Sequence, residues 1–299
     1  MINKTIKPDR TASSSIDSGC TENKNLAHLI IYKSQHQQNI IQNTAMFTKP
    51  FAFTLFLFVL FGGLAFLQPV KAQNATAILA KVDSVQNAFA DMTANEQMII
   101  TDANGSQKER TLRINQKGSE LRMVRFLEPA DVRGVGFLRV ASDRLYLYLP
   151  AFRRVRRIAS SAKNENFMGT DFSYEDMSQS TYADDYNAGD LNRQQDRWIL
   201  TLSPKPGAEV SYGKLILYVD TANYVVRKVE YFEDNDSAPV KELLVDDVRQ
   251  IEGYWMGRTM EMIDLRDQHR TRLELEDIAF DQGLSESFFS ERNLKRPVQ

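Results

Sequence analysis

The sequence predicts a mostly β protein (α+β), with one wide, curved antiparallel sheet or open barrel preceded by a single long helix. Three observations support this prediction. Apolar side chains recur with a sustained helical period only over residues 74–92. After residue 92 the period changes to two, as in half-buried strands. Turn residues separate these runs at hairpin-like spacings with no long helix between them, so neighbouring strands are expected to be antiparallel.

An uncharged apolar run, Phe51–Leu67, lies between Lys49 and the small residues Val70 and Ala72. A basic start, an apolar stretch and small residues before a cleavage point are the parts of a secretory signal. We therefore interpret residues 46–72 as a signal peptide that is cleaved after Ala72. The alternative is an uncleaved membrane anchor, because about seventeen apolar residues is the lower limit for spanning a bilayer.

Residues 1–45 are polar, rich in Ser, Asn and Gln, and have no sustained period. Met46 directly precedes the basic start of the signal, so one interpretation is that translation begins there. The other is that residues 1–45 form a disordered extension. Residues 73–299 contain no repeat and no Pro/Gly/Ser-rich linker, which predicts a single domain.

Composition excludes several functions for residues 73–299. The only cysteine, Cys20, lies upstream, which rules out disulfides, thiol nucleophiles and thiolate metal sites. Subtracting the seven Lys/Arg and three Asp/Glu of residues 1–72 from totals of 37 and 39 leaves 30 basic and 36 acidic residues. The resulting net charge of about −6 argues against nucleic acid as a partner, because its binding needs a basic surface.

The helix predicted over residues 74–92 has one apolar stripe, formed by Ile78, Val82, Val85, Phe89 and Met92. Such a stripe either covers the sheet completely or leaves part of the concave face open for a ligand. The predicted strands that follow are separated by turns at Asn104-Gly105, Lys117-Gly118, Pro204–Gly207, Asp220–Asn223 and Asp234–Asp236.

Two kinds of strand are predicted from the alternation. Leu112 with Ile114, and Leu273 with Leu275, alternate with polar residues and predict strands with one buried face. Residues 145–149 and 215–219 are apolar on both faces. Their second face needs additional cover, which a packed helix, a partner or a ligand could supply. The inward candidates for ligand contact on these strands are Leu145, Leu147, Leu149, Leu215 and Leu217.

Four arginines occupy a segment of five residues: Arg153, Arg154, Arg156 and Arg157. One interpretation is internal pairing with the acidic residues that follow, which are Asp171, Glu175, Asp176, Asp184 and Asp185. The other is a basic rim that docks to anionic lipid headgroups or to an acidic partner. Exposed ion pairs contribute only about 0–1 kcal/mol each, so stability alone is a weak reason for four arginines.

The loop after this run contains apolar residues in a polar context: Phe167, Met168, Phe172, Tyr174 and Met177. Ser173 with Asp176 three residues later predicts a capped helix start. The segment is either a lid of one helical turn over the mouth of the sheet or a plug that fills the core.

The segment from Tyr148 to Ile158, together with Met168–Asp176, resembles the signature of the outer-membrane lipoprotein-sorting-like proteins, which are related to the periplasmic lipoprotein carriers LolA and LolB. The resemblance covers residues 73–299 and implies an unclosed, strongly curved antiparallel β-barrel. It also implies an N-terminal helix and short lid helices on the concave face, over an apolar cavity that binds acyl chains. An inner-membrane lipid exporter of the resistance-nodulation-division type is the partner that the resemblance implies.

We therefore predict a periplasmic, monomeric, non-enzymatic carrier for a lipid or for the acyl chains of a lipoprotein, without cofactor or metal. The predicted ligand-binding residues are Val85, Phe89, Leu145, Leu147, Leu149, Phe167, Met168, Phe172, Tyr174, Leu215 and Leu217. The four arginines are predicted to dock to a partner or to headgroups. The main alternative is an envelope adaptor that carries no lipid, with Tyr254–Met256 either as an exposed patch or as part of a hairpin.

An enzyme is the third class considered. His269 is the only histidine after residue 72, and we expect it to be solvated in the charged turn that contains Asp267. The sequence contains no Gly-x-Ser-x-Gly motif. Asp184, Asp185 and Asp190 offer carboxylates for calcium, although adjacent acids in a loop are usually solvated.

Overall fold

Alternating side chains build one antiparallel sheet. The computed structural model describes residues 70–179, 181–234 and 236–298. The first strands are β1 (Asp91–Thr101), β2 (Gln107–Lys117), β3 (Leu121–Glu128), β4 (Gly136–Ala141), β5 (Arg144–Leu149) and β6 (Arg154–Arg157). The remaining strands are β7 (Tyr186–Gln194), β8 (Arg197–Pro204), β9 (Lys214–Asp220), β10 (Val226–Phe232), β11 (Lys241–Ile251), β12 (Tyr254–Asp264) and β13 (His269–Phe280).

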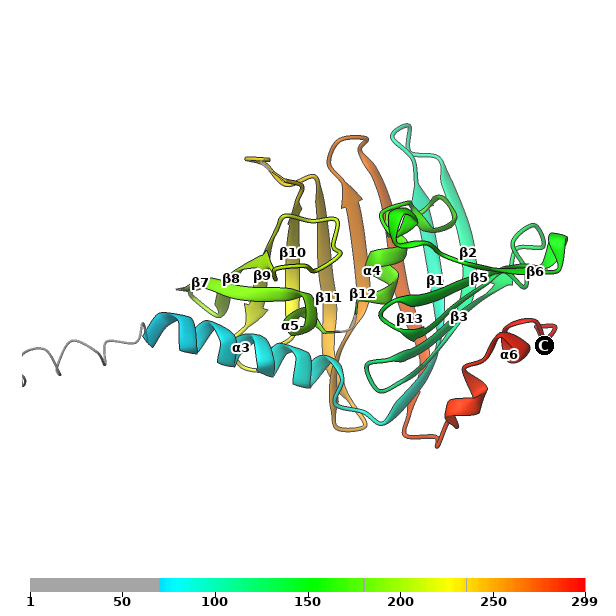
Figure 1. Ribbon diagram of the computed structural model, residues 1–299, viewed down its shortest axis with the longest axis horizontal. Helices are drawn as coiled ribbons and strands as arrows, with labels where there is room; N and C mark the ends of the chain where they lie inside the picture. Colours follow the sequence, from blue (N-terminus) through cyan, green and yellow to red (C-terminus); the bar gives the residue numbers. More distant parts are fainter. Residues whose placement is uncertain (1–69, 180, 235, 299) are drawn as a thin grey trace, which may run out of the picture. The chain divides into compact units, whose positions relative to one another are not determined.

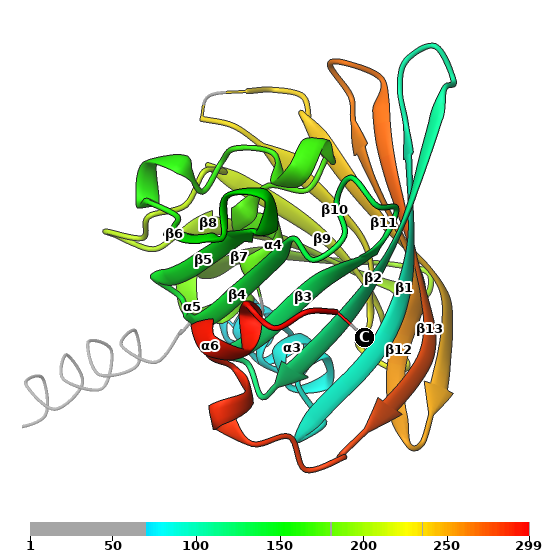
Figure 2. The ribbon, with the colours of Figure 1, turned by 90° about the vertical axis from the view of Figure 1, so that its right-hand side faces the viewer.

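The strand order is β6-β5-β4-β3-β2-β1-β13-β12-β11-β10-β9-β8-β7. β1 pairs with β13, so the first and last strands lie side by side in the middle of the sheet. β6 and β7 form the two edges and are not paired with each other. The predicted unclosed antiparallel sheet is therefore confirmed, and Figures 1 and 2 show its strands following one another around a concave interior.

The alternation predicted from the sequence places apolar side chains on the concave face. In β2 and β13, Leu112, Leu273 and Leu275 are buried. In β9 the burial alternates strictly, with Leu215, Leu217 and Val219 inside. The five predicted turns lie at the connections β1–β2, β2–β3, β8–β9, β9–β10 and β10–β11, and three of them begin at the last residue of the preceding strand. Tyr254–Met256 belongs to β12, directly after the hairpin tip.

The first helix ends earlier than predicted. α3 spans Val70–Gln86, whereas the apolar stripe predicted a helix over residues 74–92. Phe89 and Met92 instead pack with Phe280 in a separate buried cluster. The chain is held in its extended path from Asp91, which is 1% exposed and accepts hydrogen bonds from three backbone N–H groups of residues 282–284 at 2.8–3.0 Å. These bonds join the start of β1 to the chain after β13.

The C-terminal segment covers the convex face of β3–β5. It contains η5 (Glu286–Phe288) and α6 (Glu291–Leu294), and its residues Phe289 and Leu294 pack against Met123, Leu138 and Tyr148. Because Tyr148 lies on the tyrosine face of β5, this segment supplies the additional cover that the apolar pattern of residues 145–149 requires. Of the three alternatives, a packed helical segment is the one observed there.

The connection from β6 to β7 crosses the concave interior (Figure 2). It includes η3 (Ser160–Ala162), η4 (Phe167–Gly169), α4 (Tyr174–Ser178) and α5 (Tyr182–Asp185), and a short η2 (Pro150–Phe152) precedes β6. Phe167 is fully buried, with its ring centroid 5.7 Å from Phe126, 5.8 Å from Phe137 and 5.6 Å from Tyr174. This aromatic cluster fills one part of the concavity.

The predicted helix start at Ser173 is confirmed. The Ser173 side chain accepts a hydrogen bond from the Asp176 backbone, and the Asp176 carboxylate accepts one from the Ser173 backbone. This capping box begins α4. The next turn, α5, is held to α3 because Asp83 accepts hydrogen bonds from the N–H groups of Tyr182 and Ala183 at 2.8 and 2.9 Å. Burial raises the pKa of Asp83, and these two bonds act in the opposite direction.

The predicted N-terminal extension, residues 1–45, lies outside the described residues, as does the signal peptide apart from residues 70–72 at the start of α3. Within the described part of the chain, no helix combines the length and apolar character needed to cross a bilayer.

The contact between β4 and the C-terminal segment generates a stability prediction. A Cβ added to Gly136 would lie 2.6 Å from Cδ1 of Leu294, which is fully buried. We expect Gly136→Ala to destabilise the protein by about 1–3 kcal/mol through overpacking, and Leu294→Ala by about 2–5 kcal/mol through a cavity. In the double variant the alanine methyl group has room, so the cost of Gly136→Ala should fall by more than half.

Urea unfolding of the wild type, both single variants and the double variant measures this coupling. An equal cost of Gly136→Ala in both backgrounds would show that Leu294 does not press on this strand.

Candidate functional site

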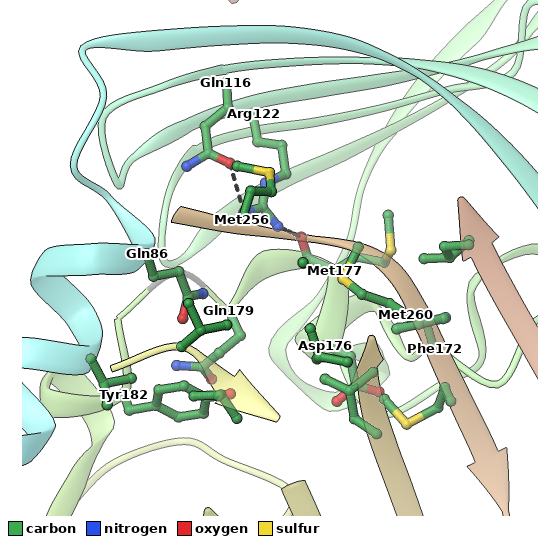
Figure 3. A pocket seen from close by; sticks show the side chains of 18 of the residues that line it. Gln86, Gln116, Arg122, Phe172, Asp176, Met177, Gln179, Tyr182, Met256 and Met260 are labelled. Carbon is green, nitrogen blue, oxygen red and sulfur yellow. Dashed lines mark hydrogen bonds between the residues drawn. The ribbon is translucent and has the colours of Figure 1, made fainter. Parts of the chain in front are cut away.

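A cavity of about 270 Å³ lies in the part of the concavity that the aromatic cluster does not fill. Residues of α3, α4 and the inner faces of β1–β3 and β9–β13 line it (Figure 3). Gln86 at the end of α3 and Trp255 at the start of β12 line it and are also exposed, Trp255 by 40%, so the cavity reaches the surface between them. An engineered apolar cavity of about 150 Å³ already binds benzene, so this space can hold an organic ligand.

The cavity wall is mainly apolar and contains five methionines: Met92, Met177, Met256, Met260 and Met262. Methionine is unbranched and polarizable, so a wall of methionines adapts to ligands of different shape. Leucine and valine side chains from β9–β13 complete this wall. These methionines come from three separate elements, so the sequence alone does not show that they lie around one cavity.

Four of the predicted ligand-binding residues line this cavity: Val85, Phe89, Phe172 and Leu215. They come from three segments that are far apart in the sequence, since Val85 and Phe89 are only four positions apart, and the fold brings these segments together around one space. Phe172 lies in the chain directly before α4, and Val85 lies in the last turn of α3. Leu215 contributes from the inner face of β9.

The other predicted ligand-binding residues lie elsewhere in the interior. Leu145, Leu217 and Phe167 are fully buried within the main core, and Tyr174 packs against Phe167 in the aromatic cluster. Leu147, Leu149 and Met168 are half-buried against the same core. In the described structure, none of these seven residues borders the cavity. The sequence pattern identifies the inner face correctly but does not say which part of that face is left open.

Three polar side chains of neighbouring strands face the cavity: Glu96 of β1, Gln116 of β2 and Arg122 of β3. The Arg122 guanidinium donates one hydrogen bond to the Gln116 side chain at 2.9 Å and another to the Met177 carbonyl oxygen at 2.8 Å (Figure 3). Burial lowers the pKa of Arg122 to about 10, and the nearby positive charge of Arg139 acts in the same direction. Burial raises the pKa of Glu96 to about 8, and Arg122 partly opposes this rise.

Sequence analysis missed Glu96 and Arg122. The available signal was a charge in the inward register of each strand, such as Glu96 between Ala94 and Met98, which are both buried. Such a charge is an exception to the alternation that identifies the strand. The bond from Arg122 to a backbone carbonyl on α4 leaves no trace in the sequence.

The connection from β6 to β7, which we call the crossing segment, forms one wall of the cavity. Several hydrogen bonds hold it to the rest of the structure. Glu175 of α4 accepts hydrogen bonds from the Ser211 backbone at 3.0–3.1 Å and from its hydroxyl. Burial raises the pKa of Glu175, and these bonds lower it. Asp176, whose pKa burial also raises, accepts a hydrogen bond from the Tyr212 hydroxyl at 3.3 Å. Together with the bond from Arg122, these contacts hold α4 against two different parts of the structure, strand β3 and the loop before β9.

His269 is not the solvated residue that the sequence predicted. Its Nδ1 lies 2.7 Å from the carboxylate of Asp171, which is 2% exposed, and the Thr271 hydroxyl donates to the same carboxylate at 2.7 Å. The expectation was wrong because the turn before β13 folds against the crossing segment. This pair fastens the loop before α4 to β13. Among the described residues, no three metal-binding side chains are close enough together to hold an ion.

Internal pairing of the arginine run is not observed. Arg157 pairs with Asp143 at 3.4 Å, and both side chains are largely exposed. In the described structure no ion pair links the run to the acidic residues that follow it; several of these acids have other partners, such as His269 for Asp171 and Ser211 for Glu175. Arg153, Arg154 and Arg156 are exposed, next to Phe152, which is 71% exposed. The run therefore forms an open basic surface, which we call the basic hairpin (residues 150–157).

Replacing Glu96 by Gln should stabilise the protein increasingly as the pH rises. The ordinary carboxyl pKa of 4.5 is raised to about 8 in the folded protein, so between these values only the unfolded chain has released the proton. Rising pH therefore favours unfolding of the wild type, by at most about 5 kcal/mol above pH 8. Urea unfolding of both proteins at pH 5 and pH 9 tests this, with Glu109→Gln on the exposed part of β2 as the control. An advantage of Glu96→Gln that is the same at both pH values would contradict the prediction.

This chain is similar to a known protein family and to several solved structures. A family model described as "Uncharacterized protein" matches residues 118–296. An outer membrane lipoprotein-sorting protein domain from Vibrio parahaemolyticus is 28% identical, with a TM-score of 0.70 over 75% of this chain and 100% of that one. A DUF1329 family protein from Desulfovibrio piger is 26% identical, with a TM-score of 0.70 over 75% of this chain and 99% of that one.

A LolA superfamily protein from Nitrosomonas europaea is 19% identical and shares the fold, with a TM-score of 0.62 over 73% of this chain and 98% of that one. No curated protein sequence matches the chain. Because the family model covers more than half of the 299 residues, membership follows from it. The chain shares its fold with the outer membrane lipoprotein-sorting protein domain and with the LolA superfamily protein. It belongs to the family that this model describes.

Proposed function

We propose that the protein is a non-enzymatic carrier that holds a lipid, or the acyl chains of a lipoprotein, in its cavity for transfer toward the outer membrane. The single observation that carries this proposal is the methionine-rich apolar cavity of about 270 Å³, which reaches the surface beside Trp255. Each methylene group that enters such a cavity contributes about 0.8 kcal/mol. Burial of part of one acyl chain therefore suffices for reversible holding, which a carrier needs.

The arrangement of polar groups supports a carrier over a hydrolase. Serine chemistry needs a free base beside a nucleophile. A carboxylate bound to Nδ1, as Asp171 is to His269, also occurs in catalytic triads, but here the Thr271 hydroxyl donates to that carboxylate and not to the histidine, so Thr271 is not placed as a nucleophile for this base. The pair thus has a fastening role in the fold, and the cavity itself contains no histidine among its described residues.

In this proposal the protein works in the periplasm, with residues 46–72 as the export signal, and an inner-membrane lipid exporter of the resistance-nodulation-division type delivers the cargo. The basic hairpin is the proposed docking surface. Its arginines have no internal acidic partners beyond the Arg157–Asp143 pair among the described residues, and Phe152 at its tip presents an aromatic ring to the solvent. Arginines beside an exposed ring suit the headgroup region of an anionic membrane.

The same hairpin favours a second candidate, an envelope adaptor that docks without carrying lipid. Native purification followed by mass spectrometry of an organic extract separates the two. Copurified lipid supports the carrier, whereas a lipid-free protein without affinity for acyl probes supports the adaptor.

A charge inside the cavity should block acyl binding. Met260 of β12 lines the cavity, whereas Ile263 of the same strand does not. We expect Met260→Glu to weaken binding of a fluorescent fatty-acyl probe at least tenfold, because the carboxylate is costly beside a hydrocarbon tail. Ile263→Glu adds the same charge outside the cavity and should bind as the wild type does. Circular dichroism verifies that both variants fold, and equal binding by both would remove this cavity as the acyl site.

The basic hairpin should govern membrane docking. Each arginine near an anionic surface contributes about 1 kcal/mol, so Arg153→Gln with Arg154→Gln should weaken binding to vesicles containing anionic phospholipid by about 10- to 30-fold, with a smaller salt dependence. The control, Arg249→Gln with Arg266→Gln, removes the same charge from arginines that are ion-paired on the surface. Equal losses in the two double variants would show that only net charge matters.

A further inference from the structure

Glu96 occupies an apolar position on the concave face. It lies in β1 between Ala94 and Met98, and its partners across the neighbouring strands are Leu112 and Leu275. Directly opposed residues of antiparallel strands share a face, so the four nearest positions around this carboxyl are all apolar. The residue is 1% exposed and borders the cavity.

The carboxyl of Glu96 has hydrogen-bonding capacity that the described chain does not use. Its Oε1 is buried and has no partner, and it is the one carboxyl oxygen in this condition among the described residues. The other buried carboxylates each accept two or more hydrogen bonds, as Asp83, Asp91 and Glu175 illustrate. An unsatisfied buried polar atom is destabilising, so an exception that faces a cavity indicates a group from outside the chain.

Charge restricts what that group can be. The described cavity wall contains the carboxyls of Glu96, Glu175 and Asp176, and Arg122 is its one cationic side chain. Arg122 is already engaged with Gln116 and the Met177 carbonyl. Even without Glu96, a phosphate or another anion would therefore meet two carboxyls, Glu175 and Asp176, against one guanidinium.

Burial raises the pKa of Glu96 to about 8, so near neutral pH its carboxyl is largely protonated. A protonated carboxyl both donates and accepts a hydrogen bond. A hydroxyl group does the same, and it carries no charge that would meet Arg122.

We propose that Glu96 is a ligand-binding residue whose carboxyl forms a hydrogen bond with the hydroxyl group of a neutral amphiphile, while the hydrocarbon tail of that amphiphile fills the cavity. This inference rests on the proposed carrier function and deepens it by naming the class of ligand. The inner polar group is a hydroxyl, as in a long-chain alcohol or an acylglycerol, and not a phosphate.

Competition against a fluorescent fatty-acyl probe tests the proposal with three compounds of equal chain length: 1-dodecanol, its methyl ether and dodecyl phosphate. One net hydrogen bond is worth about 0.5–1.5 kcal/mol, which is about 2- to 12-fold in affinity. We expect the wild type to prefer the alcohol to the ether by this factor and to bind the phosphate less tightly than the alcohol. Glu96→Gln, which keeps a donor and an acceptor, should retain the preference, and Glu96→Leu should abolish it.

Glu109→Leu, which removes a carboxyl from the exposed part of β2 outside the cavity, is the matched control and should leave the preference unchanged. Equal binding of alcohol and ether to the wild type, tighter binding of the phosphate, or a preserved preference in Glu96→Leu would each overturn the role of Glu96. The wild-type comparison decides even where a variant does not fold. If the fatty-acyl probe itself does not bind, the carrier function fails instead.

Discussion

The open sheet imposes one constraint on which the rest of the structure depends: its two edges, β6 and β7, do not pair, yet the interior between them must be filled. The connection between these two edge strands lies within the concavity and fills part of it. Phe167 and its aromatic neighbours close one part of the interior, and α3 packs against β7, α5 and β12 in another. The cavity is the space that these two fillings leave, so its position follows from how far each of them reaches.

Most of the fold could be predicted from the sequence because strands of this protein alternate and its turns carry glycine or adjacent polar residues. Local rules also located the capping box at Ser173, which depends on residues only three positions apart. The end of α3 could not be located in this way. Phe89 continues the helical spacing, but Asp91 draws the chain into the sheet through bonds to residues about 190 positions later. A periodic pattern in the local sequence does not predict a hydrogen bond to so distant a residue.

The site was predictable only in part, for a related reason. Strand alternation predicted Leu215, the helical period predicted Val85 and the apolar loop residues predicted Phe172, and these three line the cavity. Whether an inner residue meets a cavity or a packed neighbour depends on the depth of the concavity at that strand, which is why Leu145 and Leu217 proved to be sealed in the core. The polar members of the site violate the alternation. A charged residue in an inward register is a visible signal, and at Glu96 it marked the cavity more directly than the apolar pattern did.

The pairing of β1 with β13 also determines when the protein can fold. Both arms of the sheet meet at this seam, and the convex face of β3–β5 is covered only by residues after β13. The arm from β6 to β1 cannot be completed until the residues after β13 have been made. Contacts between such distant parts of a chain form slowly. Consecutive strands of each arm can form hairpins as they are made, so the β1–β13 seam and the convex cover are the parts of the structure that must assemble last.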